Sequence, residues 1–209
     1  MGKEIKKCTI ISGAPDYSVD FLISNIDCNS FIIAADSGYK KLLSANIKPD
    51  MIIGDFDSSP KPDVECDILT LPCQKDDTDT FYCVKKAVEL GFNDITIMFA
   101  VGNRFDHTYS NILCLDYCYK LNVNCVIKDN HNKISLIDNE HTFSKEYSYF
   151  SLFAFLDDCK GVSIKGSHYD VCNIDIATHN QFAQSNQIKD DFCTVTVKQG
   201  RLLLVESND

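Results

Sequence analysis

Residues 95–107, ITIMFAVGNRFDH, join an apolar run to a polar loop. The run from Ile95 to Val101 has the β-branched and aromatic composition of a buried strand. Apolar residues at helical spacing follow over residues 112–119, and a second short apolar run comes at residues 125–127. A strand, a helix and a strand in this order predict a parallel pair of strands with the helix packed on one face of their sheet.

The same alternation runs through the first two-thirds of the chain. The pattern predicts strands at residues 8–12, 31–35, 51–53 and 68–71, and helices over residues 39–43 and 79–90. Asp76 is a possible N-cap of the second helix, and Gly91 is its expected C-cap. We therefore expect an α/β domain over residues 1–139, with a largely parallel sheet flanked by helices.

The pattern changes in the last third of the chain, where short β-rich runs replace the helical periods. The runs are residues 149–155, 161–165, 175–178, 192–197 and 202–205. Residues 198–201, Lys-Gln-Gly-Arg, are typical of a hairpin turn between the last two runs. We expect residues 140–209 to form a second, all-β domain with the architecture of a small sandwich.

The composition narrows the classes of function. The 209 residues carry a formal net charge of −10 at pH 7, which argues against a general attraction to nucleic acid or to an anionic membrane. No stretch has the length of a membrane span, and residues 3–7 are not followed by the apolar run of a signal peptide. The 11 cysteines are odd in number and lack a regular spacing, which is typical of free thiols in a reducing cytosol. We therefore expect a cytoplasmic protein.

Two carboxylates one residue apart mark the loop after the third apolar run, in the sequence GDFDS at residues 54–58. In an extended backbone Asp55 and Asp57 point to the same side, while Phe56 points into the protein. Like charges on one side repel each other unless they share a cation, and carboxylate oxygens are the ligands that Mg²⁺ prefers. We expect Asp79, in the first turn of a predicted helix, to complete this magnesium site.

Further polar residues follow the ends of predicted strands, where open parallel sheets bind their ligands. They are Asp36, Arg104, Asp106 and His107, and Lys75 lies beside the acid cluster of residues 76–79. The planar guanidinium of Arg104 suits phosphate oxygens, and it precedes a helix start, where unpaired N–H groups favour anions. Each of these residues also has a possible structural role instead of a role in binding. Arg104 could pair with Asp106, and Lys75 with its acidic neighbours. Asp36 could be a turn residue, and His107 a capping residue.

Acids for a divalent ion, together with cationic groups for phosphate on a doubly wound sheet, indicate phosphoryl or nucleotidyl transfer. The chain lacks the G-x-x-x-x-G-K-[ST] motif of P-loop kinases. It also lacks the G-x-G-x-x-G motif of dinucleotide-binding domains. The residues thus predict that acids on loops bind a magnesium nucleotide.

Five motifs occur in the order and at the spacing found in the thiamine pyrophosphokinase family, which this chain resembles over nearly its whole length. The motifs are ADSG at residues 35–38, PD at 49–50, GDFDS at 54–58, KDDTD at 75–79 and GNRFDH at 102–107. Residues 184–187, QSNQ, stand where the family's β domain has a Ser-Asn pair. The resemblance implies an α/β domain that binds Mg-ATP, a β sandwich that helps to bind thiamine, and a homodimer whose active site is shared between subunits.

By motif position, the resemblance also implies a role for each candidate residue. The metal ligands would be Asp55, Asp57 and Asp79. ATP and its phosphates would contact Asp36, Lys75, Arg104, Asp106 and His107, and thiamine would contact Asp79, Ser185 and Asn186. The expected catalytic residues are Asp57, Asp79, Arg104 and Asp106, of which either Asp79 or Asp106 accepts the proton of the thiamine hydroxyl.

The expected activity is transfer of the pyrophosphoryl group of ATP to thiamine, which gives thiamine diphosphate and AMP. Two alternatives remain at this stage. One is a pyrophosphokinase or phosphohydrolase that acts on another small alcohol, such as a pterin. The other is a nucleotide-sensing module without turnover. The number of carboxylates argues against the second, because a pure binder of an anion does not need so many acids.

Overall fold

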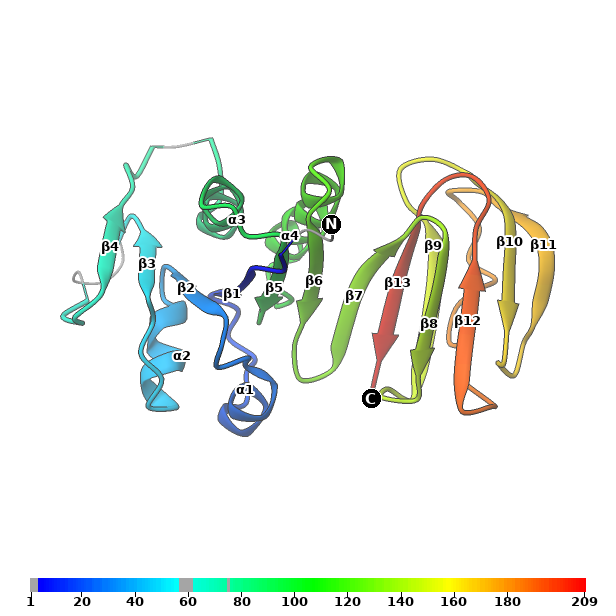
Figure 1. Ribbon diagram of the computed structural model, residues 1–209, viewed down its shortest axis with the longest axis horizontal. Helices are drawn as coiled ribbons and strands as arrows, with labels where there is room; N and C mark the ends of the chain where they lie inside the picture. Colours follow the sequence, from blue (N-terminus) through cyan, green and yellow to red (C-terminus); the bar gives the residue numbers. More distant parts are fainter. Residues whose placement is uncertain (1–3, 57–61, 75) are drawn as a thin grey trace. The chain divides into compact units, whose positions relative to one another are not determined.

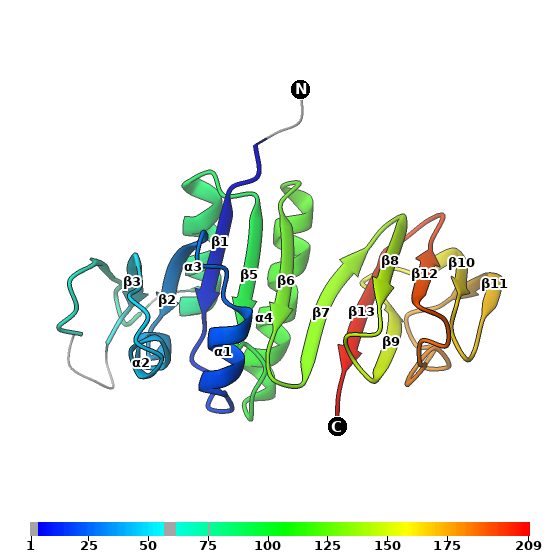
Figure 2. The ribbon, with the colours of Figure 1, turned by 60° about the horizontal axis from the view of Figure 1, so that its bottom comes forward.

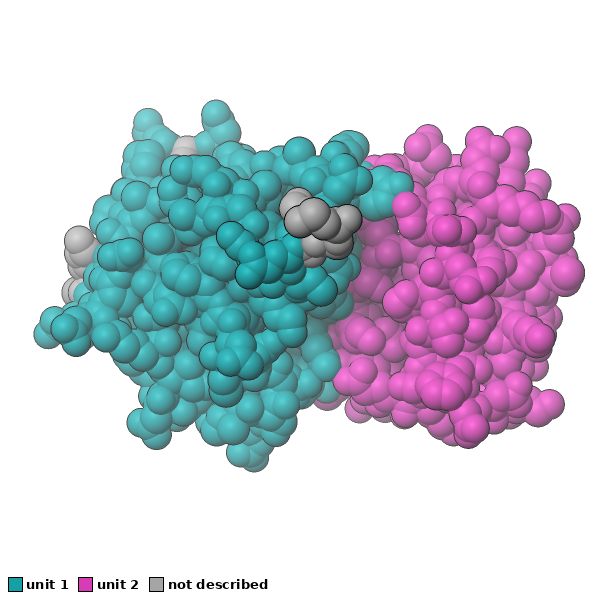
Figure 3. Space-filling view, viewed as in Figure 1, with its two compact units in different colours: residues 1–130 teal, residues 131–209 magenta. Residues whose placement is uncertain are grey.

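The computed structural model describes residues 4–56, 62–74 and 76–209. The chain forms two compact units, residues 1–130 and residues 131–209, which Figure 3 shows in different colours. Each unit has an apolar core of its own. Over the described residues, no helix has both the length and the apolar character needed to cross a lipid bilayer.

The first unit is built on an open sheet in which neighbouring strands are parallel (Figure 1). The strand order is β4-β3-β2-β1-β5-β6. The strands are β1 (Lys7–Ile11), β2 (Phe31–Ala35), β3 (Met51–Gly54), β4 (Asp67–Thr70), β5 (Asp94–Met98) and β6 (Asn124–Lys128). The central strands β1 and β2 are buried along almost their whole length, as expected for parallel strands that are covered on both faces.

Helices connect these strands and cover both faces of the sheet (Figure 2). Helices α1 (Val19–Asn25) and α2 (Gly38–Ser44) lie on one face, and α3 (Asp79–Glu89) and α4 (Phe105–Lys120) lie on the other. On the first face, Leu22 and Leu42 are fully buried in one cluster with Ile11. On the second face, the rings of Phe81 and Tyr117 join α3 to α4 edge to face, with centroids 5.0 Å apart.

The strand order reverses between β1 and β5. The chain runs outward from β1 through β2 and β3 to β4, and α3 then carries it back to β5 on the other side of β1. Helix α2 begins close to the end of β1, because Gly38 has no side chain. A Cβ atom at Gly38 would lie 2.1 Å from the carbonyl oxygen of Ile11. In open α/β sheets, the crevice at such a reversal is the usual place for a ligand.

The second unit is a sandwich of two antiparallel sheets, with strand orders β7-β13-β9 and β11-β10-β12-β8. The strands are β7 (Asn132–Ile137), β8 (Glu140–Ser144), β9 (Tyr149–Ala154), β10 (Cys159–Lys165), β11 (Val171–Ile176), β12 (Phe192–Thr196) and β13 (Leu202–Ser207). Buried residues alternate along β9 and β13 with the period of two that a strand with one buried face requires. Leu152 and Leu204 from one sheet pack in one cluster with Val162 and Val195 from the other.

The predicted fold class, a parallel α/β domain followed by an all-β sandwich, is confirmed. The compact units divide between Asn130 and His131, whereas the sequence placed the division between residues 139 and 140. The difference comes from β7, a strand that the sequence patterns do not mark. It pairs with β13 along its whole length and therefore belongs to the second unit. Helix α1 and strand β8 are also missed.

The expected hairpin between the last two strands is wrong. Strand β12 lies in one sheet of the sandwich and β13 in the other, so residues 198–201 carry the chain across the sandwich. Gly200 has a φ of 92°. A Cβ atom there would lie 2.8 Å from the carbonyl oxygen of Asp158, so that only glycine fits without displacing the neighbouring backbone. Turn residues predict where a chain reverses, but they do not specify which sheet the next strand joins.

Candidate active site

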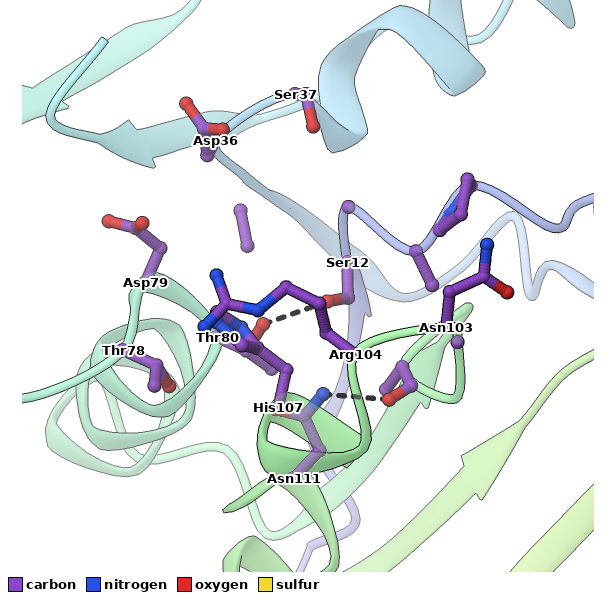
Figure 4. A pocket seen from close by; sticks show the side chains of 16 residues that line it. Ser12, Asp36, Ser37, Thr78, Asp79, Thr80, Asn103, Arg104, His107 and Asn111 are labelled. Carbon is purple, nitrogen blue, oxygen red and sulfur yellow. Dashed lines mark hydrogen bonds between the residues drawn. The ribbon is translucent and has the colours of Figure 1, made fainter. Parts of the chain in front are cut away.

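A cavity of about 430 Å³ lies where the ends of β1, β2 and β5 meet the first turns of α3 and α4 (Figure 4). This is the crevice expected at the reversal of strand order, and its volume suits a small organic ligand. The lining segments are residues 12–15 after β1, 35–37 at the end of β2, 78–80 at the start of α3, and residues 100, 102–104, 107 and 111 after β5 and on α4.

Buried hydrogen bonds fix the loops around this cavity. Ser12 Oγ and Thr80 Oγ1 lie 2.8 Å apart and join the end of β1 to the first turn of α3 (Figure 4). The Ser12 amide donates to the carbonyl oxygen of Met98 at 2.9 Å. Asn111 Nδ2 donates to the carbonyl oxygen of Ala100 at 2.7 Å. The three side chains of Ser12, Thr80 and Asn111 are buried, so these bonds are shielded from water and hold the lining segments in place.

Asp36 follows β2 in a left-handed backbone conformation, with a φ of 44°. This conformation costs a non-glycine residue roughly 1–2 kcal/mol. Its amide donates to the carbonyl oxygen of Ile53 at 2.8 Å, and a Cβ atom on the adjacent Gly54 would lie 3.3 Å from Asp36 Oδ1. That oxygen is buried and has no hydrogen-bond partner among the described residues. A strained and unsatisfied carboxylate at a cavity favours a binding role over that of a turn residue.

Asp79 is the first residue of α3, and its side chain faces the cavity (Figure 4). The N-cap of this helix is Thr78, whose Oγ1 accepts a hydrogen bond from the Phe81 amide at 3.2 Å, so the expected Asp76 cap is wrong. The N-terminus of α3 carries partial positive charge, which stabilises a carboxylate or a bound anion there. One turn further along, burial and then the charge of Asp79 raise the pKa of the Cys83 thiol, which therefore stays neutral.

Arg104 and His107 line the cavity from the start of α4. Arg104 also pairs with Asp106 in two hydrogen bonds, Nη2 to Oδ2 at 2.6 Å and Nε to Oδ1 at 3.3 Å. The bond from Arg104 lowers the pKa of Asp106, and the same bond raises the pKa of Arg104. The two side chains are 71% and 65% exposed, so the pair is screened by water and easily exchanged. The structural alternative considered for Arg104 is therefore present, and it leaves Arg104 at the edge of the cavity.

Asp55 follows β3 and is half-buried, but it does not line the cavity. At Phe56 the backbone has a φ of 53°, so the extended geometry expected for this loop is wrong. Phe56 does pack against the core of the first unit. Asp57 and Lys75 lie outside the described residues. Within the described ranges, no group of three or more His, Cys, Asp or Glu side chains is arranged to hold a metal ion.

Ser185 and Asn186, the predicted thiamine contacts, lie in the second unit and differ in their surroundings. Asn186 is 3% exposed. Its Nδ2 donates to the carbonyl oxygen of Tyr169 at 3.1 Å and to Ser167 Oγ at 3.2 Å. Its Oδ1 accepts from the amides of Tyr169 at 3.2 Å and of Gln187 at 2.9 Å. The Asn186 amide is thus fully used inside the unit, whereas Ser185 is exposed.

Some residues of the site escape the sequence analysis. Asn111 lies one helical turn after His107, a spacing that would have placed both on one face of α4. Ser12 ends an apolar run just before a Gly-Ala-Pro segment, which is a usable signal of a loop at a strand end. Thr80 lies on the buried side of α3, where an apolar residue would be expected. No sequence signal distinguishes the buried Lys41 from the exposed Lys40 beside it.

The fold and the cavity together define a two-unit protein, an α/β unit followed by a β sandwich, with a ligand-sized cavity at the reversal of strand order in the first unit. The family model "Thiamin pyrophosphokinase, catalytic domain" matches residues 23–127, and the model "Thiamin pyrophosphokinase, vitamin B1 binding domain" matches residues 132–202. The chain is also 27% identical to the thiamine pyrophosphokinase of Bacillus subtilis (strain 168) over 214 residues, which cover 98% of this chain and 100% of the relative.

Solved structures agree with this match. The crystal structure of the Bacillus subtilis thiamine pyrophosphokinase has a TM-score of 0.89 at 26% identity and covers 98% of this chain and 100% of its own. The thiamin pyrophosphokinase of Geobacillus thermodenitrificans shares the fold with a TM-score of 0.85 at 24% identity, over 97% and 98% of the two chains. The yeast enzyme shares it with a TM-score of 0.79 at 15% identity, over 99% and 87%.

The chain belongs to the thiamin pyrophosphokinase family. This membership favours the predicted thiamine pyrophosphokinase over the two alternatives, an enzyme that acts on another small alcohol and a sensing module without turnover.

Proposed function

We propose that this protein transfers the pyrophosphoryl group of ATP to the hydroxyl oxygen of thiamine. The hydroxyl oxygen attacks the β-phosphorus of ATP. The bond between that phosphorus and the oxygen that bridges it to the α-phosphorus breaks, and AMP leaves with the bridging oxygen. One observation carries the proposal: Asp36, Asp79 and Arg104 border a single cavity in a chain that both family models match.

The triphosphate of ATP binds at the edge of the cavity where α3 and α4 begin. The N-termini of these two helices favour anions, and Arg104 and His107 line the same edge. Arg104 exchanges its exposed partner Asp106 for phosphate oxygens, to which its planar guanidinium can donate two hydrogen bonds. In a chain with a net charge of −10, such local positive groups are what allow a polyanion to bind. Lys75 is a further proposed phosphate contact.

Mg²⁺ is the proposed metal, and Asp55, Asp57 and Asp79 are its proposed ligands. Carboxylates are the donors that this ion prefers, and the unsatisfied Oδ1 of Asp36 adds a further oxygen at the cavity. When bound, Mg²⁺ would neutralise charge on the phosphate oxygens.

Asp79 is the proposed acceptor of the hydroxyl proton. Asp79 and Asp106 are the two candidates, and they differ in position. The Asp79 side chain faces the cavity (Figure 4), whereas Asp106 is exposed and bound to Arg104. A general base must lie within hydrogen-bond reach of the proton that it removes, which favours Asp79. Asp106 then has the role of holding Arg104 in the absence of phosphate.

Thiamine is proposed to bind to Asp79 and to Ser185, across two subunits of a homodimer in which each active site is shared. Large apolar side chains that are exposed in the single chain support an assembly. Phe105 and Tyr109 on α4 are 74% and 50% exposed, and Tyr169 in the second unit is 72% exposed. We expect sedimentation at micromolar concentration to show a two-chain species. A fully active species of one chain would contradict the shared site.

A cytoplasmic location is the last part of the proposal. All 11 cysteines are free thiols, and this supports a reducing compartment.

The reaction can be tested by incubating the protein with ATP, Mg²⁺ and thiamine and separating the products by chromatography. We expect AMP and thiamine diphosphate in equal amounts. Formation of ADP with thiamine monophosphate would indicate transfer of the γ-phosphoryl group alone. Consumption of ATP at the same rate without thiamine would indicate a hydrolase, and either result would overturn the proposed function.

A further inference from the structure

A buried lysine lies directly behind one wall of the cavity. Lys41 in α2 is 5% exposed. Its Nζ donates a hydrogen bond to the carbonyl oxygen of Ser12 at 2.7 Å. The same Nζ lies 5.3 Å from the ring centroid of Tyr17 and 5.8 Å from that of Phe99. Among the described residues, this ammonium thus contacts one carbonyl group and two aromatic rings, and it forms no ion pair with a carboxylate.

A charge in this position is unfavourable for folding. Burial lowers the pKa of Lys41 from 10.5 to about 8, which means that the folded state disfavours the ammonium form. A neutral side chain of similar volume would remove this cost, because buried charges without an ionic partner destabilise proteins. The two rings and the carbonyl group offset only part of the lost hydration. Stability alone therefore does not explain a lysine at this position.

The acceptor of Lys41 belongs to the cavity. Ser12 is a lining residue, and its hydroxyl is bonded to Thr80, the neighbour of Asp79. The segment that follows Ser12 is also fixed from behind, since the amide of Ala14 donates to the carbonyl oxygen of Phe99 at 3.2 Å. Lys41 thus ties α2 to the first residue of the segment of residues 12–15, and Lys41 itself does not line the cavity.

We propose that Lys41 is a positioning residue for the polyphosphate of the nucleotide, because it fixes residues 12–15 against the cavity and, when protonated, supplies a positive charge behind them. The inference rests on the proposed function, in that the anion is taken to be ATP. It assigns Lys41 no contact with the substrate. It also gives a reason for a buried cation that lowers stability.

The proposal links nucleotide binding to protonation of Lys41. An anion in the cavity favours the ammonium form, so nucleotide raises the pKa of Lys41, and the protonated protein binds nucleotide more tightly. The dissociation constant for ATP should therefore increase as the pH rises through about 8. The segments around Lys41 carry other charged or titratable groups: Asp16 and Tyr17 after β1, Asp36 after β2, Tyr39 and Lys40 on α2, and Lys128 at the end of β6.

The contribution of Lys41 to the free energy of unfolding should change with pH in the direction opposite to the affinity for ATP. The folded-state pKa is about 8 and the unfolded-state value is 10.5, so between these values the unfolded chain binds more protons. The contribution of Lys41 to the free energy of unfolding therefore rises with pH across this window. Replacing Lys41 by a neutral residue should remove this rise.

The variant Lys41→Met tests the inference, with Lys40→Met as the matched control at the exposed neighbouring lysine. Mg-ATP binding is measured by titration calorimetry without thiamine, from below to above the pKa of Lys41. We expect Lys41→Met to weaken ATP binding by about ten-fold at neutral pH and to flatten the pH dependence, because one nearby charge is lost. Its unfolding midpoint should be unchanged or higher, and Lys41→Arg should recover part of the affinity. Lys40→Met should behave like the wild type.

Unchanged ATP affinity in Lys41→Met would overturn the inference, and so would weaker binding that Lys41→Arg fails to recover. If Lys41→Met does not fold, NMR of the wild-type protein labelled with ¹³C at the lysine Cε provides the test. The titration of Lys41 should then move to higher pH when Mg-ATP is added, and an unmoved titration would overturn the inference. Absence of ATP binding to the wild type would be a different result, since it would contradict the proposed function itself.

Discussion

Three buried polar groups, two in the first unit and one in the second, differ in how far their hydrogen bonds and charges are satisfied. In the first unit, Asp36 Oδ1 is buried with no hydrogen-bond partner among the described residues, and Lys41 is buried with no carboxylate beside it. In the second unit, Asn186 is as deeply buried, but every donor and acceptor of its amide is used. Unsatisfied groups lower stability and are therefore typical of ligand sites, whereas satisfied groups specify a fold. The candidate chemistry of the chain thus lies in the first unit.

Topology explains the difference. Parallel strands end at one edge of their sheet, so the loops after β1, β2 and β5 converge with the N-termini of two helices. The sandwich has no such edge, and its loops must satisfy their own backbone groups. Asn186 does this for the backbone of Tyr169 and Gln187. The comparison can be tested by substitutions that separate loss of activity from loss of stability.

The largest effect is expected for Asp79→Asn. The change removes the charge of a side chain that faces the cavity, and with it the proposed metal ligand and proton acceptor. We expect kcat to fall by about 10²–10³-fold, the usual cost of removing one preorganised group at a reacting centre. The unfolding midpoint should change little, because Thr78 rather than Asp79 caps α3. Steady-state kinetics and thermal unfolding measure the two quantities.

Asp77→Asn is the matched control for this variant. Asp77 lies close to Asp79 in sequence but pairs with Lys85 and does not line the cavity. It should therefore keep kcat within about two-fold, as expected for a partly exposed ion pair away from the chemistry. Equal losses of activity in Asp77→Asn and Asp79→Asn would show that the negative charge of the loop matters, and not the position of Asp79.

The second effect is one of stability and concerns the second unit. Asn186→Ala removes four hydrogen bonds of a buried amide and leaves the buried Ser167 hydroxyl and the partly buried backbone groups of Tyr169 and Gln187 without this partner, so the free energy of unfolding should fall by about 2–3 kcal/mol. Ser185→Ala removes an exposed hydroxyl and should leave stability unchanged. It should raise the KM for thiamine by about five-fold, the value of one hydrogen bond. Urea denaturation and initial rates separate these outcomes.

The opposite result for Asn186→Ala would contradict the difference drawn between the two units. If Asn186→Ala kept full stability and lost thiamine affinity, the amide would leave its internal partners when the substrate binds. Asn186 would then be a direct thiamine contact, as the resemblance of residues 184–187 to the family motif implies.

Much of the fold follows from local patterns. Buried parallel strands such as β2 are continuous apolar runs. Helix α3 ends at Glu89 with Leu90 as its C-cap, and Gly91, the expected cap, is the next residue and has a φ of 86°. The missed elements lack such patterns. Strand β7 carries polar residues among its apolar ones, and α1 has only one fully buried residue, Leu22. The pairing of β13 with β7 and β9 is a long-range choice that no turn signal specifies.

The sequence predicted the site residues that follow strands or begin helices. It did not predict the features of the site that depend on an unusual backbone conformation or on burial. The positions of Asp36, Asp79 and Arg104 at one cavity follow from the convergence of strand ends and helix starts. The left-handed backbone at Phe56 could not be inferred, because aromatic residues rarely adopt positive φ. The burial of Lys41 also escaped prediction, since lysine is almost always exposed.

The smallest effect is expected for Asp106→Asn. This variant tests whether an exposed carboxylate outside the cavity takes part in the reaction. Asp106 is exposed and bound to Arg104, and it does not line the cavity. Arg104 lowers the pKa of Asp106, so the carboxylate is ionised across the neutral range and the pair is lost only in acid, as the pH falls through that lowered pKa. Loss of the pair leaves Arg104 available to phosphate, so we expect kcat to stay within about two-fold and the KM for ATP to be equal or lower between pH 6 and 8. A loss of kcat as large as that of Asp79→Asn would instead make Asp106 the proton acceptor, and would require α4 to turn this side chain into the cavity when ATP binds.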